Sequence, residues 1–199
     1  MREIHAAFPI PIVVYSIDKI LTEELFYVNR LPRVANSCNM NSKDNYVLRN
    51  HPELKRIADF AEQCLNDFLQ EIYCPATDVS LYITQSWANY TTRGQNHHLH
   101  RHPNSFLSGV FYLSVKPEDK IVFVKDSPPA IEMIPRAPNG WNSNTMPFTV
   151  RPGELVVFPS SLMHMVDRVF TPDTRVSIAF NSFLRGTIGG ATQLGELIL

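Results

Sequence analysis

The sequence predicts a mainly β fold of the α+β class, a sandwich or closed barrel of jelly-roll type with N-terminal helices packed on one sheet. Three observations predict it. From residue 78 onward, apolar residues alternate with a period of two, as they do in strands. Turn-forming sequences, such as Arg151-Pro152-Gly153, separate several of these short strands. No helical pattern intervenes, and many short strands without intervening helices indicate a sandwich or a closed barrel.

The part of the chain before residue 78 is expected to hold one strand and two helices. An edge strand is predicted over 9–16, a short helix over 18–28 and a polar, irregular segment over 30–50. The clearest helix is predicted over 51–73, where apolar residues recur at helical spacing. These residues are Leu54, Ile57, Ala61, Cys64, Leu65, Phe68 and Ile72. One face of this helix should therefore pack on a sheet.

The second part of the chain is expected to form strands over residues 79–88, 108–114, 120–125, 148–150, 154–158, 166–170 and 175–183. The long segment 127–147 contains five prolines and Trp141. Since long loops in compact domains are often functional, we expect this segment to act as a lid over the substrate site. The elements predict a single domain over 1–199, with an N-terminal part (1–77), a jelly-roll core (78–185) and a C-terminal tail (186–199).

Composition and charge argue against several classes of protein. At 199 residues and a formal net charge of −1, the chain has no basic field for nucleic acid. Its three cysteines are irregularly spaced, so a reducing, cytoplasmic compartment is expected. No stretch approaches the roughly 20 apolar residues that span a bilayer, and the N-terminus is interpreted as a strand rather than a signal peptide. The edge strand 9–16 or the tail 194–199 could pair with a second copy in a homodimer.

The most informative feature is a histidine cluster, because four of the seven histidines fall within residues 97–102, in the run HHLHRH. In an extended segment, residues i and i+2 point the same way, so His100 and His102 could bind one metal ion together. By spacing alone, His98 could pair with His100 equally well. With His100 and His102 taken as the ligands, His97 and His98 are expected to be solvated neighbours of the cluster. His164 follows about sixty residues later, after a predicted strand. A close pair plus a distant histidine on a β scaffold predicts a mononuclear metal site.

A second polar group is predicted on the last strand of the core. There Arg175 and Ser177 share one face, while apolar residues occupy the other face. A guanidinium beside a hydroxyl suits a small carboxylate, which it can bind through two hydrogen bonds. The alternative is an internal ion pair, for which Glu154 or Asp173 could supply the acid. Tyr112 joins the group if its strand turns that face inward, and Tyr90 could point inward as well.

The order and spacing of these residues resemble the 2-oxoglutarate and Fe(II)-dependent oxygenase superfamily. The resemblance rests on HRHPNSFLSGVFYL over 100–113, GELVVFPS over 153–160, the single His164 and an RxSxxxN pattern over 175–181. It covers about residues 80–185 and is closest to a little-characterised phage and bacterial branch near the prolyl hydroxylases. It implies a double-stranded β-helix, the cupin-like form of the jelly roll, with the metal near one open end.

The resemblance also implies a role for each position. The implied ligands of Fe(II) are His100, His102 and His164. His102 falls where most of the superfamily has Asp or Glu, so three neutral imidazoles would leave the metal fully dicationic. The implied contacts of 2-oxoglutarate are Arg175, which would grip the C5 carboxylate, then Ser177, Tyr112 and Val110.

With Fe(II), 2-oxoglutarate and O₂, the expected activity is that of a non-haem dioxygenase. Decarboxylation of 2-oxoglutarate to succinate would be coupled to oxidation, by default hydroxylation, of an unknown small molecule or protein side chain. The enzyme would work in the cytoplasm, of the host cell if it is phage-encoded. Two alternatives stay open. One is a three-histidine, cupin-like dioxygenase or isomerase in which Arg175 binds the substrate's own carboxylate, and the other is a non-enzymatic binding module.

Overall fold

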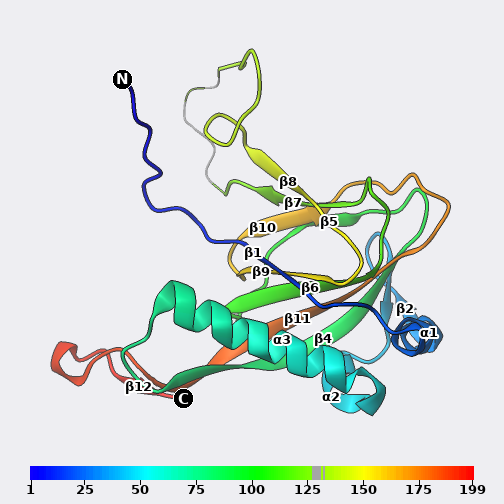
Figure 1. Cartoon of the computed structure of the whole chain (residues 1–199), viewed down its shortest axis with the longest axis horizontal. Helices are drawn as coiled ribbons and strands as arrows, with labels where there is room; N and C mark the ends of the chain where they lie inside the picture. The colour runs from blue at the N-terminus through cyan, green and yellow to red at the C-terminus, as the bar shows by residue number, and fades with distance from the viewer. Residues whose placement is uncertain (127–130, 132) are drawn as a thin grey trace.

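Two antiparallel β-sheets form a jelly roll, with helices packed on the outer face of the larger sheet, in the computed structural model of this chain (Figure 1). The structure describes residues 1–126, 131 and 133–199. The mainly β, jelly-roll fold is thereby confirmed. No helix in these described ranges is long and apolar enough to cross a membrane.

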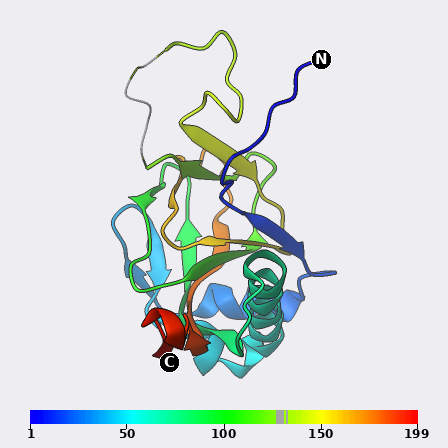
Figure 2. The ribbon, with the colours of Figure 1, turned by 90° about the vertical axis from the view of Figure 1, so that its left-hand side faces the viewer.

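The larger sheet has eight strands and the smaller has four. Across the larger sheet the order is β1 (Val13–Ser16), β9 (Glu154–Pro159), β6 (Leu107–Ser114), β11 (Arg175–Ile188), β4 (Val79–Thr91), β3 (Met40–Ser42) and β2 (Arg33–Ala35), with β12 (Leu197–Ile198) paired to β11. Across the smaller sheet it is β5 (His97–His100), β10 (Met163–Val166), β7 (Lys120–Val124) and β8 (Thr145–Thr149). Figure 2 shows the two sheets stacked above the helices.

Several strands differ from the sequence-based prediction. The predicted strand over 166–170 is wrong, because β10 ends at Val166, where its pairing with β5 also ends. β5 itself was not predicted as a strand, since its HHLH sequence carries no alternating apolar residues. The segment 30–50 is not irregular throughout, because it contains β2, β3 and the short helix α2 (Val47–Asn50). Strands of three residues are too short to show a period.

The helices cover one face of the larger sheet. They are α1 (Thr22–Arg30), α2 and α3 (Lys55–Phe68), with 3₁₀ turns at Pro52–Leu54 and Ala191–Gln193. α3 buries a stripe of apolar residues against the sheet, as predicted: Ile57, Ala61, Cys64, Leu65 and Phe68. The expectation for Ile72 is wrong, because the chain widens into a π-helical turn at Leu69–Tyr73 and leaves this side chain 45% exposed.

β11 separates the two interiors of the molecule. Its residues Val176, Ile178 and Phe180 belong to the core between the larger sheet and the helices. The alternate residues Arg175, Ser177 and Ala179 line a pocket on the opposite face, between the two sheets. A second, smaller core fills the rest of that space and consists of Tyr112, Ile121, Phe123, Val150, Val156 and Phe158. The period of two along β11 therefore carries polar groups into the space between the sheets.

Gly109 on β6 lets the ring of Phe180 lie directly against the backbone. The two residues face each other across the β6–β11 ladder, and a Cβ at Gly109 would overlap with the buried ring. We therefore expect Gly109→Ala to lower the free energy of unfolding by about 1–3 kcal/mol, the usual cost of overpacking a core. Urea denaturation measures this loss. Gly140→Ala, where the added methyl meets only the end of the Met146 side chain at 4.0 Å, is the control, and an equal effect in both variants would contradict the argument.

Candidate metal site

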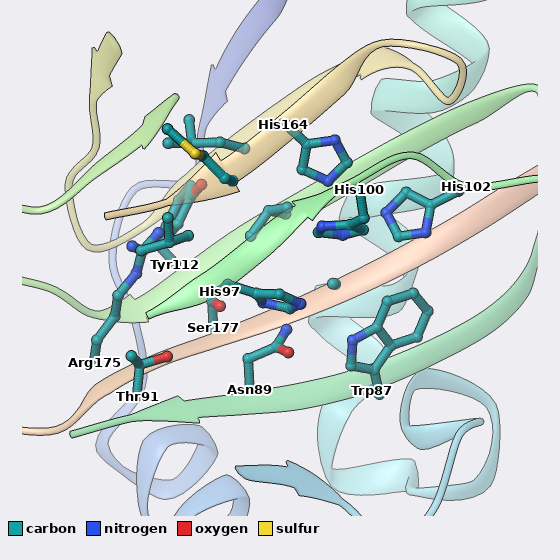
Figure 3. A pocket seen from close by; sticks show the side chains of 15 residues that line it. Trp87, Asn89, Thr91, His97, His100, His102, Tyr112, His164, Arg175 and Ser177 are labelled. Carbon is teal, nitrogen blue, oxygen red and sulfur yellow. The ribbon is translucent and has the colours of Figure 1, made fainter. Parts of the chain in front are cut away.

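The pocket between the two sheets is lined by fifteen residues (Figure 3). β4, β6 and β11 of the larger sheet form one wall, and β5 and β10 of the smaller sheet contribute most of the other. The predicted metal ligands and the predicted carboxylate contacts all line this one pocket.

Three histidines converge at one end of the pocket. His100, His102 and His164 each offer a ring nitrogen, and these atoms lie within 4.8 Å of one another. His100 and His164 are direct partners across the β5–β10 ladder, so the pairing register places their rings together. His102 lies just beyond β5, where its backbone N–H donates to the carbonyl of Ser160 at 3.0 Å. Figure 3 shows the three rings turned toward a common point.

Backbone carbonyls set which nitrogen of two of these rings faces the pocket. Nδ1 of His100 lies 2.8 Å from the carbonyl oxygen of His98, and Nδ1 of His164 lies 2.9 Å from that of Leu162. Because a carbonyl only accepts hydrogen bonds, each Nδ1 carries the proton and donates it. The unprotonated Nε2 is therefore left as the lone-pair donor in both rings. This is how histidine ligands are usually oriented in metal sites.

Burial keeps the three imidazoles neutral. Burial, together with the proximity of His100, lowers the pKa of His164 to about 3 and that of His102 to about 4. Burial also lowers the pKa of His100. The neutral ring is the form that binds a metal ion, so the three ligand atoms need not lose protons at neutral pH. These donors fit a divalent ion of the first transition series.

The depressed histidine pKa values predict a loss of stability on acidification. In the unfolded chain these rings bind protons near pH 6.5, whereas folded His164 does so only near pH 3. The unfolded state therefore binds more protons as the pH falls from about 6.5 toward 3, and stability that is full above pH 6.5 is lost across that window. The urea midpoint of the metal-free protein should fall accordingly. The fall of the urea midpoint between pH 6.5 and 5 should be smaller in His164→Asn than in the wild-type protein. An equal dependence of the midpoint on pH in both proteins would contradict a lowered pKa of His164.

His97 also lines the pocket, contrary to the expectation that it would be a solvated neighbour of the cluster. Its ring stacks on that of His100, with centroids 4.7 Å apart. Burial lowers its pKa to about 3. The register shift between β5 and β10 explains the difference, because it breaks the simple alternation along the HHLH run. His98 is exposed, as expected.

Arg175 is buried without a carboxylate partner. Its side chain lies in the pocket, 4% exposed, and Nη1 donates to the carbonyl oxygen of Lys120 at 3.1 Å. The two acids that could have paired with it are engaged elsewhere, Asp173 with Lys116 and Glu154 with Arg151. Within the described ranges Arg175 forms no ion pair. A buried, unpaired guanidinium is costly, so this geometry favours an anionic ligand over an internal ion pair.

Tyr112, Ser177 and Val110 line the pocket near Arg175, as Figure 3 shows for the first two. The Arg175 guanidinium lies 5.3 Å from the centre of the Tyr112 ring. The Tyr112 hydroxyl is buried and has no hydrogen-bond partner in the described part of the chain. Burial raises the pKa of this phenol to about 12, so it stays a proton donor. An unpartnered donor beside a guanidinium fits a carboxylate oxygen.

Replacing Tyr112 by Phe separates ligand binding from folding. Since the hydroxyl has no partner, its removal should leave the free energy of unfolding unchanged or slightly higher. Loss of one hydrogen bond to a charged ligand should weaken binding of 2-oxoglutarate about tenfold. Calorimetric titration and urea denaturation measure the two quantities. Unchanged affinity, or a clear loss of stability, would show that the hydroxyl has another role.

The sequence-based reasoning missed one wall of the pocket. Trp87, Asn89 and Thr91 alternate on β4 and face Ala179, Ser177 and Arg175 across the β4–β11 ladder. Their alternation with the apolar residues Ala88 and Tyr90 was the signal that could have found them. Tyr90 was expected to point inward, but its hydroxyl instead donates to a backbone carbonyl in the core on the helix side.

Comparison with known families identifies a similarity over the pocket-forming strands. Residues 85–181 match the family described as putative 2OG-Fe(II) oxygenases. The match runs from the middle of β4 to the middle of β11 and includes every residue of the pocket. No curated protein matches the chain at a significant level.

Solved structures show the same fold at low sequence identity. HygX from Streptomyces hygroscopicus, with nickel, 2-oxoglutarate and hygromycin B bound, is 14% identical with a TM-score of 0.61, over 87% of this chain and 82% of that one. A 2OG-Fe(II) oxygenase family oxidoreductase from Burkholderia pseudomallei is 15% identical with a TM-score of 0.58, over 86% and 83%. A Pseudomonas putida prolyl-4-hydroxylase is 12% identical with a TM-score of 0.54, over 86% and 92%.

Proposed function

We propose that the chain, whose residues 85–181 match the 2OG-Fe(II) oxygenase family, is a hydroxylase with a three-histidine metal site. In the proposed reaction a substrate C–H bond, O₂ and 2-oxoglutarate yield the alcohol, succinate and carbon dioxide. Bound Fe(II) and 2-oxoglutarate supply the chemistry that activates O₂. The protein contributes the positions of the reactants and the exclusion of water from them.

The metal would be held by the Nε2 atoms of His100 and His164 and by the ring of His102. The proximity of the three rings and the hydrogen bonds at two Nδ1 atoms support this assignment. His102 stands where the resemblance places an acid in most relatives. As a neutral ligand it adds no negative charge, so the ion would keep its full dipositive charge.

The observation that carries the proposal is the buried Arg175 without an acid partner, in the same pocket as the three histidines. We assign it to the C5 carboxylate of 2-oxoglutarate, with the hydroxyls of Tyr112 and Ser177 as further donors. Val110 would pack against the methylene groups between the two ends of the diacid. A diacid bound in this way would extend from Arg175 toward the histidines, so the pocket fixes its direction.

The substrate would be a small molecule or a protein side chain, and the solved relatives offer one example of each kind in their names: hygromycin B bound to HygX, and prolyl-4-hydroxylase. The segment 127–147 was expected to act as a lid. Residues 127–130 and 132 of it lie outside the described residues. In its described part Trp141 is 58% exposed, and no residue of that part lines the pocket, so the lid stays a prediction.

Turnover of 2-oxoglutarate tests the proposal without knowledge of the substrate. With no substrate present, one oxygen atom of O₂ enters succinate and the other needs two electrons and two protons to become water, so ascorbate is added as the reductant. We expect NMR to detect succinate when the protein, Fe(II), O₂, ascorbate and 2-oxoglutarate are combined. Omission of Fe(II) or O₂ should abolish it. Succinate formation that persists unchanged in His164→Ala would contradict the assigned site.

A further inference from the structure

With a divalent metal ion and 2-oxoglutarate both bound, the completed site would carry one positive charge that no group in the pocket neutralises. This inference rests on the proposed function. The pocket is lined by fifteen residues, and none of them is Asp or Glu. Arg175 is the single side chain among them that carries a charge in the completed site, since histidine binds a metal ion as the neutral imidazole. A divalent ion and the guanidinium bring three positive charges, and the 2-oxoglutarate dianion removes two.

Acids outside the pocket are already engaged with other groups. Asp126 pairs with Arg101 at 3.6 Å on the exposed surface, and Glu154 pairs with Arg151. Asp119 accepts a hydrogen bond from the backbone N–H of Lys116. Glu154 and Asp119 are near enough to contribute to the raised pKa of Tyr112, but none of these acids lines the pocket. The surplus charge therefore has no partner among the described residues that line the site.

We infer that the site takes one further anionic oxygen group beside the metal, and that its substrate belongs to the class that carries a carboxylate or a comparable group. The surplus positive charge arises because His102 contributes a neutral imidazole, whereas a carboxylate at this position would have balanced the charge. A buried charge without a partner is costly, so an incoming monoanion gains more here than it would at a site with an acidic ligand.

The wall beside His102 can receive such a group. The indole of Trp87 lies next to His102, with ring centroids 5.7 Å apart. Asn89, 6% exposed, is the next residue along the same face of β4, and its side-chain Nδ2 group is a hydrogen-bond donor. In Figure 3 these two side chains and His97 border the space below His100. Indole and amide N–H groups are donors for an anionic oxygen, and no acid opposes them.

Cobalt binding in the presence of formate tests this inference by affinity. Co(II) is titrated calorimetrically, without O₂, into the protein saturated with 2-oxoglutarate, with formate or with neutral formamide added. We expect formate to tighten Co(II) binding about tenfold and formamide to leave it unchanged. In His102→Asp, whose carboxylate supplies the missing charge, the formate effect should disappear. His102→Glu serves as the second variant, and circular dichroism checks that each is folded.

The outcomes separate this inference from the proposed function. If 2-oxoglutarate itself tightens Co(II) binding but formate does not, the inference of a further anionic group is wrong and the oxygenase assignment stands. If Co(II) binding releases an additional proton, seen from the dependence of the heat on the buffer, hydroxide neutralises the charge and the inference is also wrong. If 2-oxoglutarate has no effect on Co(II) binding, the proposed function itself fails. An equal formate effect in wild type and His102→Asp would show that His102 is not the cause.

Discussion

Arg175→Met is expected to abolish recognition of 2-oxoglutarate while leaving the protein folded. The buried guanidinium has no acid partner among the described residues, so its removal strands no opposite charge inside the protein. Methionine keeps most of the side-chain length and fills the same space. The free energy of unfolding should therefore stay the same or rise. Binding of 2-oxoglutarate to the metal-loaded protein should weaken about 100-fold or more, since loss of one member of a buried charge pair costs about 3–5 kcal/mol.

A matched control lies on the same strand. Arg185→Met also removes an arginine from β11, but Arg185 is exposed and lies over the ring of Tyr82, with 4.7 Å to the ring centre. This variant should bind 2-oxoglutarate with unchanged affinity. Calorimetric titration gives both constants, and urea denaturation gives both stabilities. If the two variants bind equally well, or if Arg175→Met unfolds, Arg175 is a structural residue and the carboxylate site is elsewhere.

His164→Ala is expected to have the second large effect, on metal binding. The ring stands opposite His100 in the ladder and presents Nε2 to the same point, so its loss leaves two of three ligands. Mutation of a group that hydrogen-bonds to a metal-binding side chain typically lowers metal affinity about 10–100-fold. We therefore expect loss of the metal-binding side chain itself to lower metal affinity about 100-fold or more. Metal should raise the melting temperature of the wild-type protein but not that of the variant.

His98→Ala is the control for the histidine cluster. Its side chain is exposed, and the carbonyl that receives the His100 hydrogen bond belongs to the backbone and remains. Metal affinity should stay within about threefold of wild type. A comparable loss in both variants would mean that the cluster binds metal nonspecifically through exposed rings. Inductively coupled plasma analysis of the dialysed proteins gives the metal content directly.

The strands that carry an apolar period of two could be predicted from the sequence, and the short polar ones could not. β11 and α3 alternate clearly at their own periods, and both formed with the predicted face buried. β5 is polar along its length and becomes a strand only through pairing with β10. Tertiary pairing overrides local preference in such segments. The same reason explains why β2 and β3 were not foreseen.

The candidate site was partly visible in the sequence because its residues are chemically unusual. Histidines at alternate positions and an arginine on a core strand are costly to bury, so each required an explanation. The β4 wall was not seen, since Trp87, Asn89 and Thr91 are ordinary strand-compatible residues until β4 is paired with β11. The orientation of His97 depends on a register shift, which no local pattern encodes.

The most direct test of the account is an anaerobic titration of the Fe(II)-loaded wild-type protein with 2-oxoglutarate, followed by visible absorption. The account predicts a weak charge-transfer band that saturates at one equivalent. It further predicts that 2-oxobutyrate, which lacks the carboxylate assigned to Arg175, gives the same band only at concentrations about 100-fold higher. The absence of a band would favour the three-histidine dioxygenase or isomerase that does not use 2-oxoglutarate. Equal binding of the two oxo acids would contradict the role of Arg175.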